Sequence, residues 1–186
     1  GRLIVSVRER HEADGEVVNE LVILPSDGSA EPNVIASGRD FYAAPRISPD
    51  GRRLTWLCWD HPLMPWDGTE LWTAELAGDG SVSGERLVAG GPDESILQPL
   101  WSPGGELWFA SDRTGWWNLY AVVDGKARAA SGDGEHGGRP GAAQPDLPEP
   151  CPLVSHSAEF AQAPWVFGLQ DYAFLEAYLD GLARDY

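Results

Sequence analysis

Serine, histidine and carboxylate side chains are the candidates for chemistry in this chain, and their spacing does not form a hydrolytic centre. An α/β-hydrolase carries its nucleophile in a Gly-x-Ser-x-Gly turn. The nearest stretch, residues 80–84, reads Gly-Ser-Val-Ser-Gly and has valine at its centre. The histidines are His11, His61, His136 and His156, and none lies at metal-ligand spacing from another histidine or a cysteine. We therefore predict no catalytic residue, no metal and no cofactor in this chain.

Two loops carry side chains that could hold a ligand. The first contains Asp60, His61 and Asp67, which could be read as a metal site or as a hydrogen-bonded loop, and we favour the loop. The second contains Arg113, whose guanidinium could grip a ligand carboxylate or form an ion pair with an aspartate between structural units. Loop tryptophans have an equally open role, in substrate contact, interdomain contact or packing; they are Trp59, Trp66, Trp116 and Trp117.

A repeat supplies the elements that must position these loops. The run Pro-Arg-Ile-Ser-Pro-Asp-Gly at 45–51 returns as Pro-Leu-Trp-Ser-Pro-Gly-Gly at 99–105, and a fainter copy starts at Pro164. The steps between the starts are 54 and 65 residues. Each Ser-Pro-x-Gly predicts a tight hairpin whose glycine adopts positive φ, followed by a strand rich in Leu and Trp. A period of this size, built from short strands, is typical of β-propeller blades.

We therefore predict an all-β fold, a partial β-propeller of about three blades, each a four-stranded antiparallel meander. Residues 1–38 are expected to form strands B, C and D of a partial blade, and residues 41–90 a complete blade. Residues 96–155 are expected to form a second complete blade with a flexible Gly/Pro-rich insertion at 130–150. Residues 159–186 are expected to begin a further blade, with strands at 165–168 and 172–175.

Composition limits the partners. The net charge is −16 with one lysine, which disfavours nucleic acid and anionic membrane surfaces. No apolar run approaches the length of a membrane span. The two cysteines, Cys58 and Cys151, do not make a disulfide framework. We therefore expect reduced thiols and a cytoplasmic location, without nucleic acid or membrane as a partner.

Three stretches together point to a family. They are Asp-Phe-Tyr at 40–42 with the first hairpin, Trp-Asp-His-Pro-x-Met-Pro-Trp-Asp-Gly-Thr at 59–69, and Ser-Asp-Arg-Thr-Gly-Trp-Trp-Asn-Leu-Tyr at 111–120. The combination resembles the N-terminal propeller of prolyl oligopeptidase family (S9) serine peptidases, in the branch similar to acylaminoacyl-peptidases and dipeptidyl-aminopeptidases. Gly104 departs from the usual Asp of Ser-Pro-Asp-Gly, and the individual hairpin motifs also occur in propeller repeats similar to those of the translocation protein TolB.

This resemblance implies a non-catalytic segment that restricts peptide access and packs against an α/β-hydrolase domain outside this chain. The alternative is a TolB-like scaffold or binding propeller without a hydrolase partner. A Gly-x-Ser-x-Gly elbow followed by Asp and His downstream of Tyr186 would distinguish the two.

The alternating strand direction of a meander predicts which face is functional. The B–C loops and the links from strand D to the next strand A must open on one rim, while the other rim holds minimal turns. The side chains expected on the functional rim are Asp60, His61, Trp66, Asp67, Glu94, Arg113, Trp116, Trp117 and Glu159. Because recognition usually lies on loops, we expect this rim to face the hydrolase domain and to line the substrate entrance.

Overall fold

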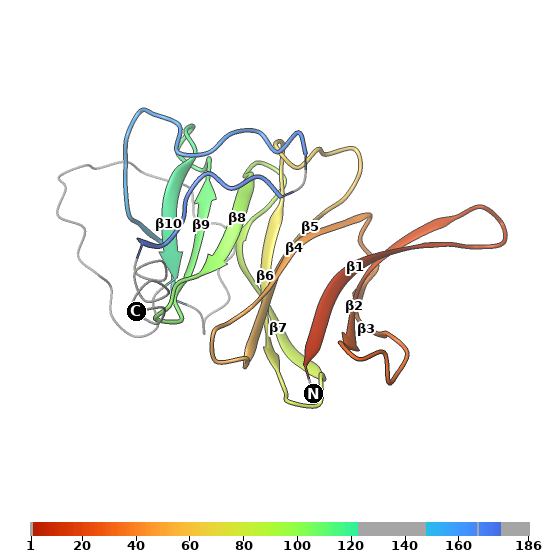
Figure 1. Cartoon of the computed structure of the whole chain (residues 1–186). Helices are drawn as coiled ribbons and strands as arrows, with labels where there is room; N and C mark the ends of the chain where they lie inside the picture. The colour runs from red at the N-terminus through yellow and green to blue at the C-terminus, as the bar shows by residue number, and fades with distance from the viewer. Residues whose placement is uncertain (1, 123–147, 167, 176–186) are drawn as a thin grey trace.

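The computed structural model describes residues 2–122, 148–166 and 168–175, and these form three antiparallel sheets side by side (Figure 1). The first sheet contains β1 (Leu3–His11), β2 (Val17–Pro25) and β3 (Asn33–Ser37). The second contains β4 (Phe41–Ile47), β5 (Arg53–Trp59), β6 (Glu70–Leu76) and β7 (Val82–Gly90). The third contains β8 (Ile96–Trp101), β9 (Leu107–Ser111), β10 (Asn118–Val122) and β11 (Cys151–Pro152).

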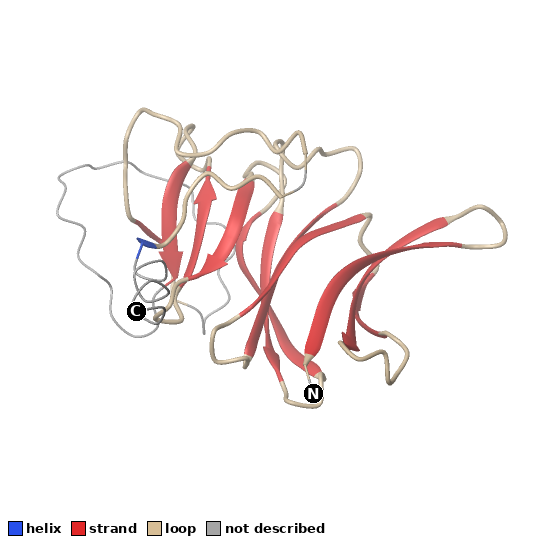
Figure 2. Cartoon of the chain, viewed as in Figure 1, coloured by secondary structure: helices blue, strands red, loops and turns tan. Residues whose placement is uncertain are grey.

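Strands follow one another in chain order within every sheet, so each sheet is a meander. Figure 2 shows the strands connected by loops, and among the described residues helix is drawn only at Leu175. The predicted all-β, partial-propeller fold is confirmed. The described residues contain no helix long and apolar enough to cross a membrane.

The repeated hairpins are fixed by the hydroxyl of their serine. Ser48 Oγ accepts a hydrogen bond from the Arg53 backbone N–H at 2.9 Å, and Gly51 N–H donates to the Ser48 carbonyl at 2.9 Å. Gly51 has φ of 74°, which an L-residue adopts only with strain. The second copy repeats these two bonds at Ser102, from Glu106 N–H and Gly105 N–H. The turn is therefore encoded locally by Ser-Pro-x-Gly.

Two apolar layers hold the sheets together. The layer between the first and second sheets contains Leu21, Leu54 and Trp56. The layer between the second and third contains Leu71, Ile96 and Phe109. Both cysteines are free, as expected; Cys58 lies in the first layer, where burial raises the pKa of its thiol to about 12. That thiol stays protonated and unreactive at neutral pH.

The first strand of each complete sheet contains a bulge at the same repeat position. Pairing shifts between Ala43 and Arg46 in β4 and between Leu97 and Leu100 in β8. Inside these bulges Ala44 has φ of 48° and Gln98 has φ of 47°, each directly before a proline. Since non-glycine residues rarely adopt this region, the two bulges are specific features of the repeat.

The segment after residue 158 differs from the prediction. Trp165, Val166 and Gly168 are not in a strand, and neither are residues 172–175. A strand needs a neighbour to bond with, and the described chain offers these residues none. Instead Ala161 packs on the outer face of the third sheet beside Leu97 and Ala110. Most of the predicted 130–150 insertion and the 176–186 tail lie outside the described residues.

Candidate functional site

We define the rim as the β5–β6 and β9–β10 loops, the β3–β4 and β7–β8 links, and residues 159–166. These segments lie together along the upper side of the molecule in Figure 1. The opposite side carries the β4–β5 and β8–β9 hairpins and the β6–β7 loop. The rim therefore contains the nine side chains that the sequence singled out, and hydrogen bonds join its segments.

The first junction joins the β3–β4 link to the β5–β6 loop. Arg39 contacts Asp60 (Nε–Oδ2 2.9 Å) and Glu70 (Nη1–Oε2 3.0 Å). The Asp40 backbone N–H donates to Asp60 Oδ1 at 2.8 Å, and the Asp40 carboxylate accepts from the His61 backbone N–H at 2.8 Å. Asp60 is therefore engaged with Arg39 and Asp40, which favours the hydrogen-bonded loop. Among the described residues, no group of three His, Cys, Asp or Glu side chains could hold a metal ion.

The second junction joins the β7–β8 link to the β9–β10 loop. Arg113 contacts Glu94 (Nη2–Oε1 2.8 Å) and lies 4.8 Å from the centre of the Tyr120 ring. Ser95 N–H donates to Asp112 Oδ1 at 2.7 Å, and Ser95 Oγ donates to the Pro65 carbonyl at 2.9 Å. Arg113 thus forms an ion pair within the third blade, with a glutamate of its preceding link rather than an aspartate of another blade.

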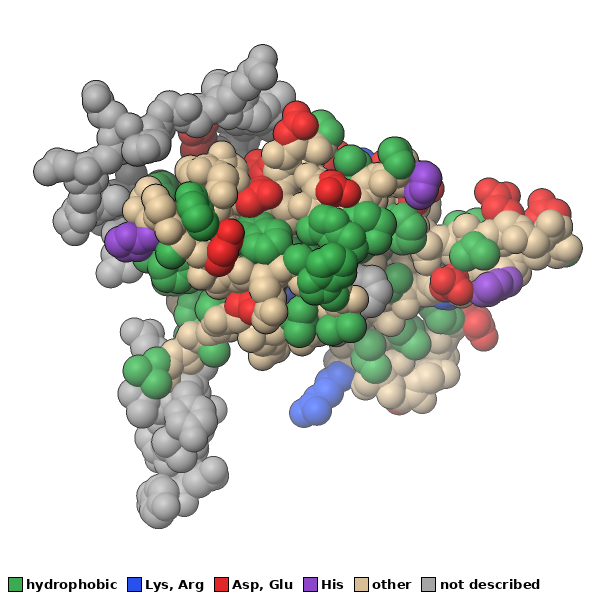
Figure 3. All heavy atoms as spheres, turned by 90° about the horizontal axis from the view of Figure 1, so that it is seen from above, with side chains coloured by type: hydrophobic (Ala, Val, Ile, Leu, Met, Phe, Trp, Pro, Cys, Tyr) green, Lys and Arg blue, Asp and Glu red, His purple; other side chains and the backbone are tan. Residues whose placement is uncertain are grey.

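The third junction places residues 159–166 against the β5–β6 and β9–β10 loops. Trp117 N–H donates to Glu159 Oε2 at 2.8 Å, and Trp165 packs on Trp66 with ring centres 4.5 Å apart. The Trp165 side chain is 72% exposed and Trp116 is 42% exposed. Figure 3 shows hydrophobic side chains in the middle of this face with acidic side chains above them and to their left. The rim therefore offers an aromatic surface with acidic side chains along part of its edge.

Close backbone contacts hold the β5–β6 loop against the β7–β8 link. Thr69 N–H donates to the Glu94 carbonyl and Gly91 N–H to the Thr69 carbonyl, both at 2.9 Å. A Cβ on Gly68 would lie 2.6 Å from the Gly91 carbonyl oxygen, and one on Gly90 would lie 2.0 Å from the Thr69 oxygen. Only glycine fits at these two positions without movement of the backbone.

Burial and charge set the pKa values of Asp112, in the rim, and of Glu70, at the start of β6, in opposite directions. Burial raises the pKa of Asp112, and the nearby carboxylates Glu94 and Glu159 add to this despite the bond from Ser95 N–H. Burial alone would also raise the pKa of Glu70. Hydrogen bonds from Arg39 and Trp72 outweigh that effect, so the pKa of Glu70 lies below its ordinary value.

The lowered pKa of Glu70 predicts an acid-dependent loss of stability. A carboxyl with a lowered folded-state pKa stabilises the fold above its ordinary pKa of 4.5, and that stabilisation is lost as pH falls through the folded-state value. We expect Glu70→Gln to lower the melting temperature at pH 7 and to flatten its decline between about pH 5 and 3. Melting curves across this range, with exposed Glu85→Gln as the control, test the expectation. An unchanged decline in Glu70→Gln would contradict it.

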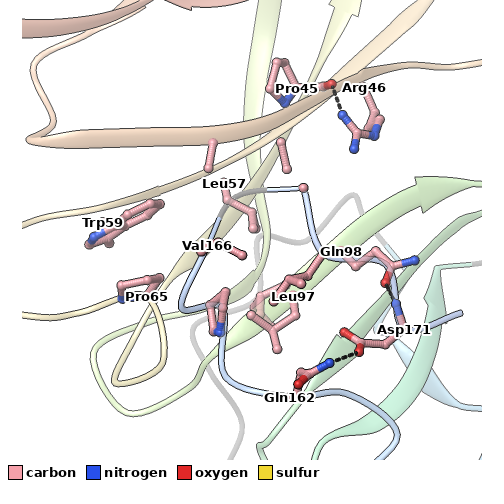
Figure 4. Close-up of a pocket in the computed structure, with 16 residues that line it drawn as sticks. Pro45, Arg46, Leu57, Trp59, Pro65, Leu97, Gln98, Gln162, Val166 and Asp171 are labelled. Atoms are coloured by element: carbon pink, nitrogen blue, oxygen red, sulfur yellow. Dashed lines mark hydrogen bonds between the residues drawn. The ribbon is translucent and has the colours of Figure 1, made fainter. Parts of the chain in front are cut away.

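A cavity of about 240 Å³ is lined by residues of β4, β8 and the segments 162–166 and 168–171 (Figure 4). Its apolar wall includes Leu57, Trp59 and Leu97. On its polar side, Gln162 Nε2 donates to Asp171 Oδ1 at 3.1 Å. Gln98 Nε2 donates to the Tyr172 carbonyl at 2.6 Å, and Tyr172 O–H donates to the Gln98 carbonyl at 2.7 Å. Gln98 thereby anchors the segment that covers the cavity.

Sequence reasoning missed two residues of the rim. Arg39 bridges two carboxylates, but a single arginine in a link gives no sequence pattern from which its partners could be predicted. Trp165 was expected in a strand, and only the fold places it on Trp66. The other expected tryptophans differ in burial: Trp59 is buried at the end of β5 and stacks on Phe41, while Trp117 packs with Leu97 and Ala110.

Comparison with known proteins gives similar solved structures. Puromycin hydrolase is 36% identical over 87% of this chain and 22% of its own, with a TM-score of 0.68. A puromycin-hydrolyzing peptidase of Mycobacterium tuberculosis is 31% identical over 93% of this chain and 27% of its own, with a TM-score of 0.67. Prolyl oligopeptidase B of Galerina marginata, 17% identical with a TM-score of 0.54, shares the fold. No protein-family model and no curated protein matches the sequence.

Three consecutive antiparallel meanders, packed face to face with their loops on a common rim, define a β-propeller segment. Together with the two structures above 30% identity, they show that the chain is a propeller segment of the prolyl oligopeptidase (S9) peptidase family. The chain spans about a fifth to a quarter of the length of the solved structures it matches.

Proposed function

We propose that this chain is the non-catalytic propeller segment of a longer S9-type serine peptidase. In this proposal the rim packs against an α/β-hydrolase domain and lines the entrance for peptides, so that the segment restricts which peptides reach the catalytic residues. The observation that carries the proposal is the rim itself. Exposed aromatic side chains and carboxylates gather there, while the opposite side has minimal turns, and fold stability alone gives no reason for that difference.

The chemistry of the rim suits the mouth of a peptide site. The Trp66–Trp165 pair, with ring planes tilted by 40°, offers an apolar surface, and Asp60 and Asp67 lie on the same loop as Trp66. Apolar peptide side chains pack on such a surface, and carboxylates attract cationic peptide groups. We further propose that the parent belongs to the branch similar to acylaminoacyl-peptidases and dipeptidyl-aminopeptidases. A cytoplasmic location, without nucleic acid or membrane partners, completes the proposal.

The test is the Trp66→Ala substitution in the full-length protein that contains this segment. We expect kcat/KM for peptide hydrolysis to fall about tenfold, which corresponds to about 1.4 kcal/mol of transition-state stabilisation. The melting temperature should change by only a few degrees, because the loop side chain is half-buried and contributes little to the apolar layers between sheets. Steady-state kinetics and thermal melts of the same preparation provide the two readouts.

Val34→Ala is the matched control, because Val34 is also partly exposed but lies on β3, away from the rim. It should leave kcat/KM unchanged. Arg113→Ala should lower both activity and stability, since Arg113 is paired with Glu94 within the fold. Full activity in Trp66→Ala at an unchanged melting temperature would contradict the proposed role of the rim.

A further inference from the structure

Residues 94–96, where the β7–β8 link enters β8, bond to two neighbouring sheets at once. On the side of the second sheet, Thr69 N–H donates to the Glu94 carbonyl at 2.9 Å, and Ile96 N–H donates to Thr69 Oγ1 at 2.6 Å. On the side of the third sheet, Glu94 Oε1 accepts from Ser111 Oγ at 2.6 Å. These three residues therefore form a bridge between the β5–β6 loop and the end of β9.

Ser95 is the central residue of this bridge and is fully buried. Its backbone N–H donates to Asp112 Oδ1 at 2.7 Å, at the start of the β9–β10 loop. Its hydroxyl donates to the Pro65 carbonyl at 2.9 Å, in the β5–β6 loop. That carbonyl belongs to the rigid peptide unit that joins Pro65 to Trp66. One buried residue thus holds the backbone beside Trp66 in a fixed place relative to the β9–β10 loop.

The preceding link shows which of these bonds belongs to the repeat. Asp40, directly before β4, also donates its backbone N–H to an aspartate directly after the next strand, Asp60. The Asp40 side chain, however, accepts from the His61 N–H in the loop of its own sheet. The backbone bond of Ser95 is therefore a repeated feature of the blade, whereas its hydroxyl bond reaches the loop of the neighbouring blade.

We propose that Ser95 is a specificity-determining positioning residue of the rim, which sets the β5–β6 loop against the β9–β10 loop so that their aromatic side chains accept a large apolar side chain of a peptide. This inference rests on the proposed function. Trp66 lies on the first loop, and Trp116, which is 42% exposed, lies on the second. A gap of about 0.5–1 Å between a ring and its ligand forfeits about a quarter to a half of the contact energy. Peptides with aromatic or long aliphatic side chains therefore depend on the placement of these loops more than peptides with small side chains do.

The experiment uses the full-length protein and pairs of fluorogenic peptides that differ only in phenylalanine or alanine at one position, with that position moved along the peptide. Ser95→Ala removes the hydroxyl and keeps the N–H that bonds to Asp112. We expect the ratio of kcat/KM for the phenylalanine peptide to that for the alanine peptide to fall about fivefold at one position or more, through a rise in KM. That is the size of effect expected from one hydrogen bond.

Two further variants make the comparison specific. Ser81→Ala is the matched control, because Ser81 Oγ also bonds to a neighbour, Asp79 Oδ1 at 2.7 Å, but lies in the β6–β7 loop on the side opposite the rim. It should leave the ratio unchanged. Ser95→Cys keeps most of the side-chain volume but is a weak donor, so its ratio should lie between those of the unmodified protein and Ser95→Ala. Thermal melts check that each variant is folded.

A double-mutant cycle separates positioning from general stability. In a Trp66→Ala background, Ser95→Ala should change the ratio less than about twofold, because its effect acts through the loop that carries Trp66. Equal loss of kcat/KM for both peptides of every pair would identify a structural role alone and overturn the inference. A ratio that changes in Trp66→Ala but not in Ser95→Ala would overturn the inference and leave the proposed function standing. Unchanged kcat/KM in Trp66→Ala would overturn both.

Discussion

Gly90→Ala is expected to destabilise the protein by about 3 kcal/mol or more, which is enough to unfold a marginally stable domain. Gly90 has φ of 98°, a conformation that costs an L-residue about 1–2 kcal/mol. Its Cβ would lie 2.0 Å from the Thr69 carbonyl oxygen, a contact that can be relieved only by moving backbone. The β6–β7 ladder would have to shift, together with the bonds from Gly91 and Thr69 that close the rim.

The size of the effect is checked by urea unfolding against Gly84→Ala. Gly84 lies in the same strand, β7, and also has positive φ, at 65°, but a Cβ there would meet nothing within 4 Å. It should therefore cost about 1 kcal/mol from backbone strain alone. Equal destabilisation in the two variants would mean that the close approach at Thr69 does not constrain the rim.

Phe109→Ala is expected to cost about 3–5 kcal/mol of unfolding free energy, as for other large-to-small changes in protein cores. Phe109 is fully buried in the layer between the second and third sheets. Its ring stacks on Tyr120 with centroids 5.9 Å apart. Removing it leaves a cavity between two sheets, each held in shape by its own backbone pairing, so the site cannot collapse fully.

Phe109→Leu keeps most of the volume and should cost about 1.5 kcal/mol or less. Phe41→Ala removes another stacked ring, but from a partly exposed position on Trp59, and should cost about 1 kcal/mol. Denaturant unfolding of the three variants gives the comparison. A loss in Phe109→Ala no larger than that in Phe41→Ala would show that the sheets do not depend on this layer.

The fold was predictable from the sequence where a structure depends only on residues close together in the chain. Ser48, Pro49 and Gly51 determine their hairpin within a few residues, and the Leu- and Trp-rich strand expected after the hairpin is β5. The segment at 165–168 was not predictable in the same way, because a strand depends on a partner as well as on its own side chains. Without that partner, Trp165 packs on Trp66 instead.

The sequence predicted where the charged rim residues lie, but not which of them pair with each other. The alternating strand direction places Glu94 and Arg113 on one side of the sheets, and residue type shows that each carries charge. Their mutual contact depends on the path of the β7–β8 link and on the Tyr120 ring beneath the guanidinium. Arg39 was overlooked for the same reason, since its two partners lie on different segments of the chain.

The bulges in β4 and β8 mark equivalent positions in two consecutive repeats, so the chain between them is one repeat unit. Ala44 and Gln98 lie 54 residues apart, have φ angles within one degree of each other and both precede proline. A chain cut before Ala44 and before Gln98 therefore yields a cassette whose two ends enter the same backbone conformation. Tandem duplication of such a cassette joins one copy to the next without new strain at the junction. The repeat thereby gives a physical route by which rings with different numbers of blades can arise from one ancestral gene segment.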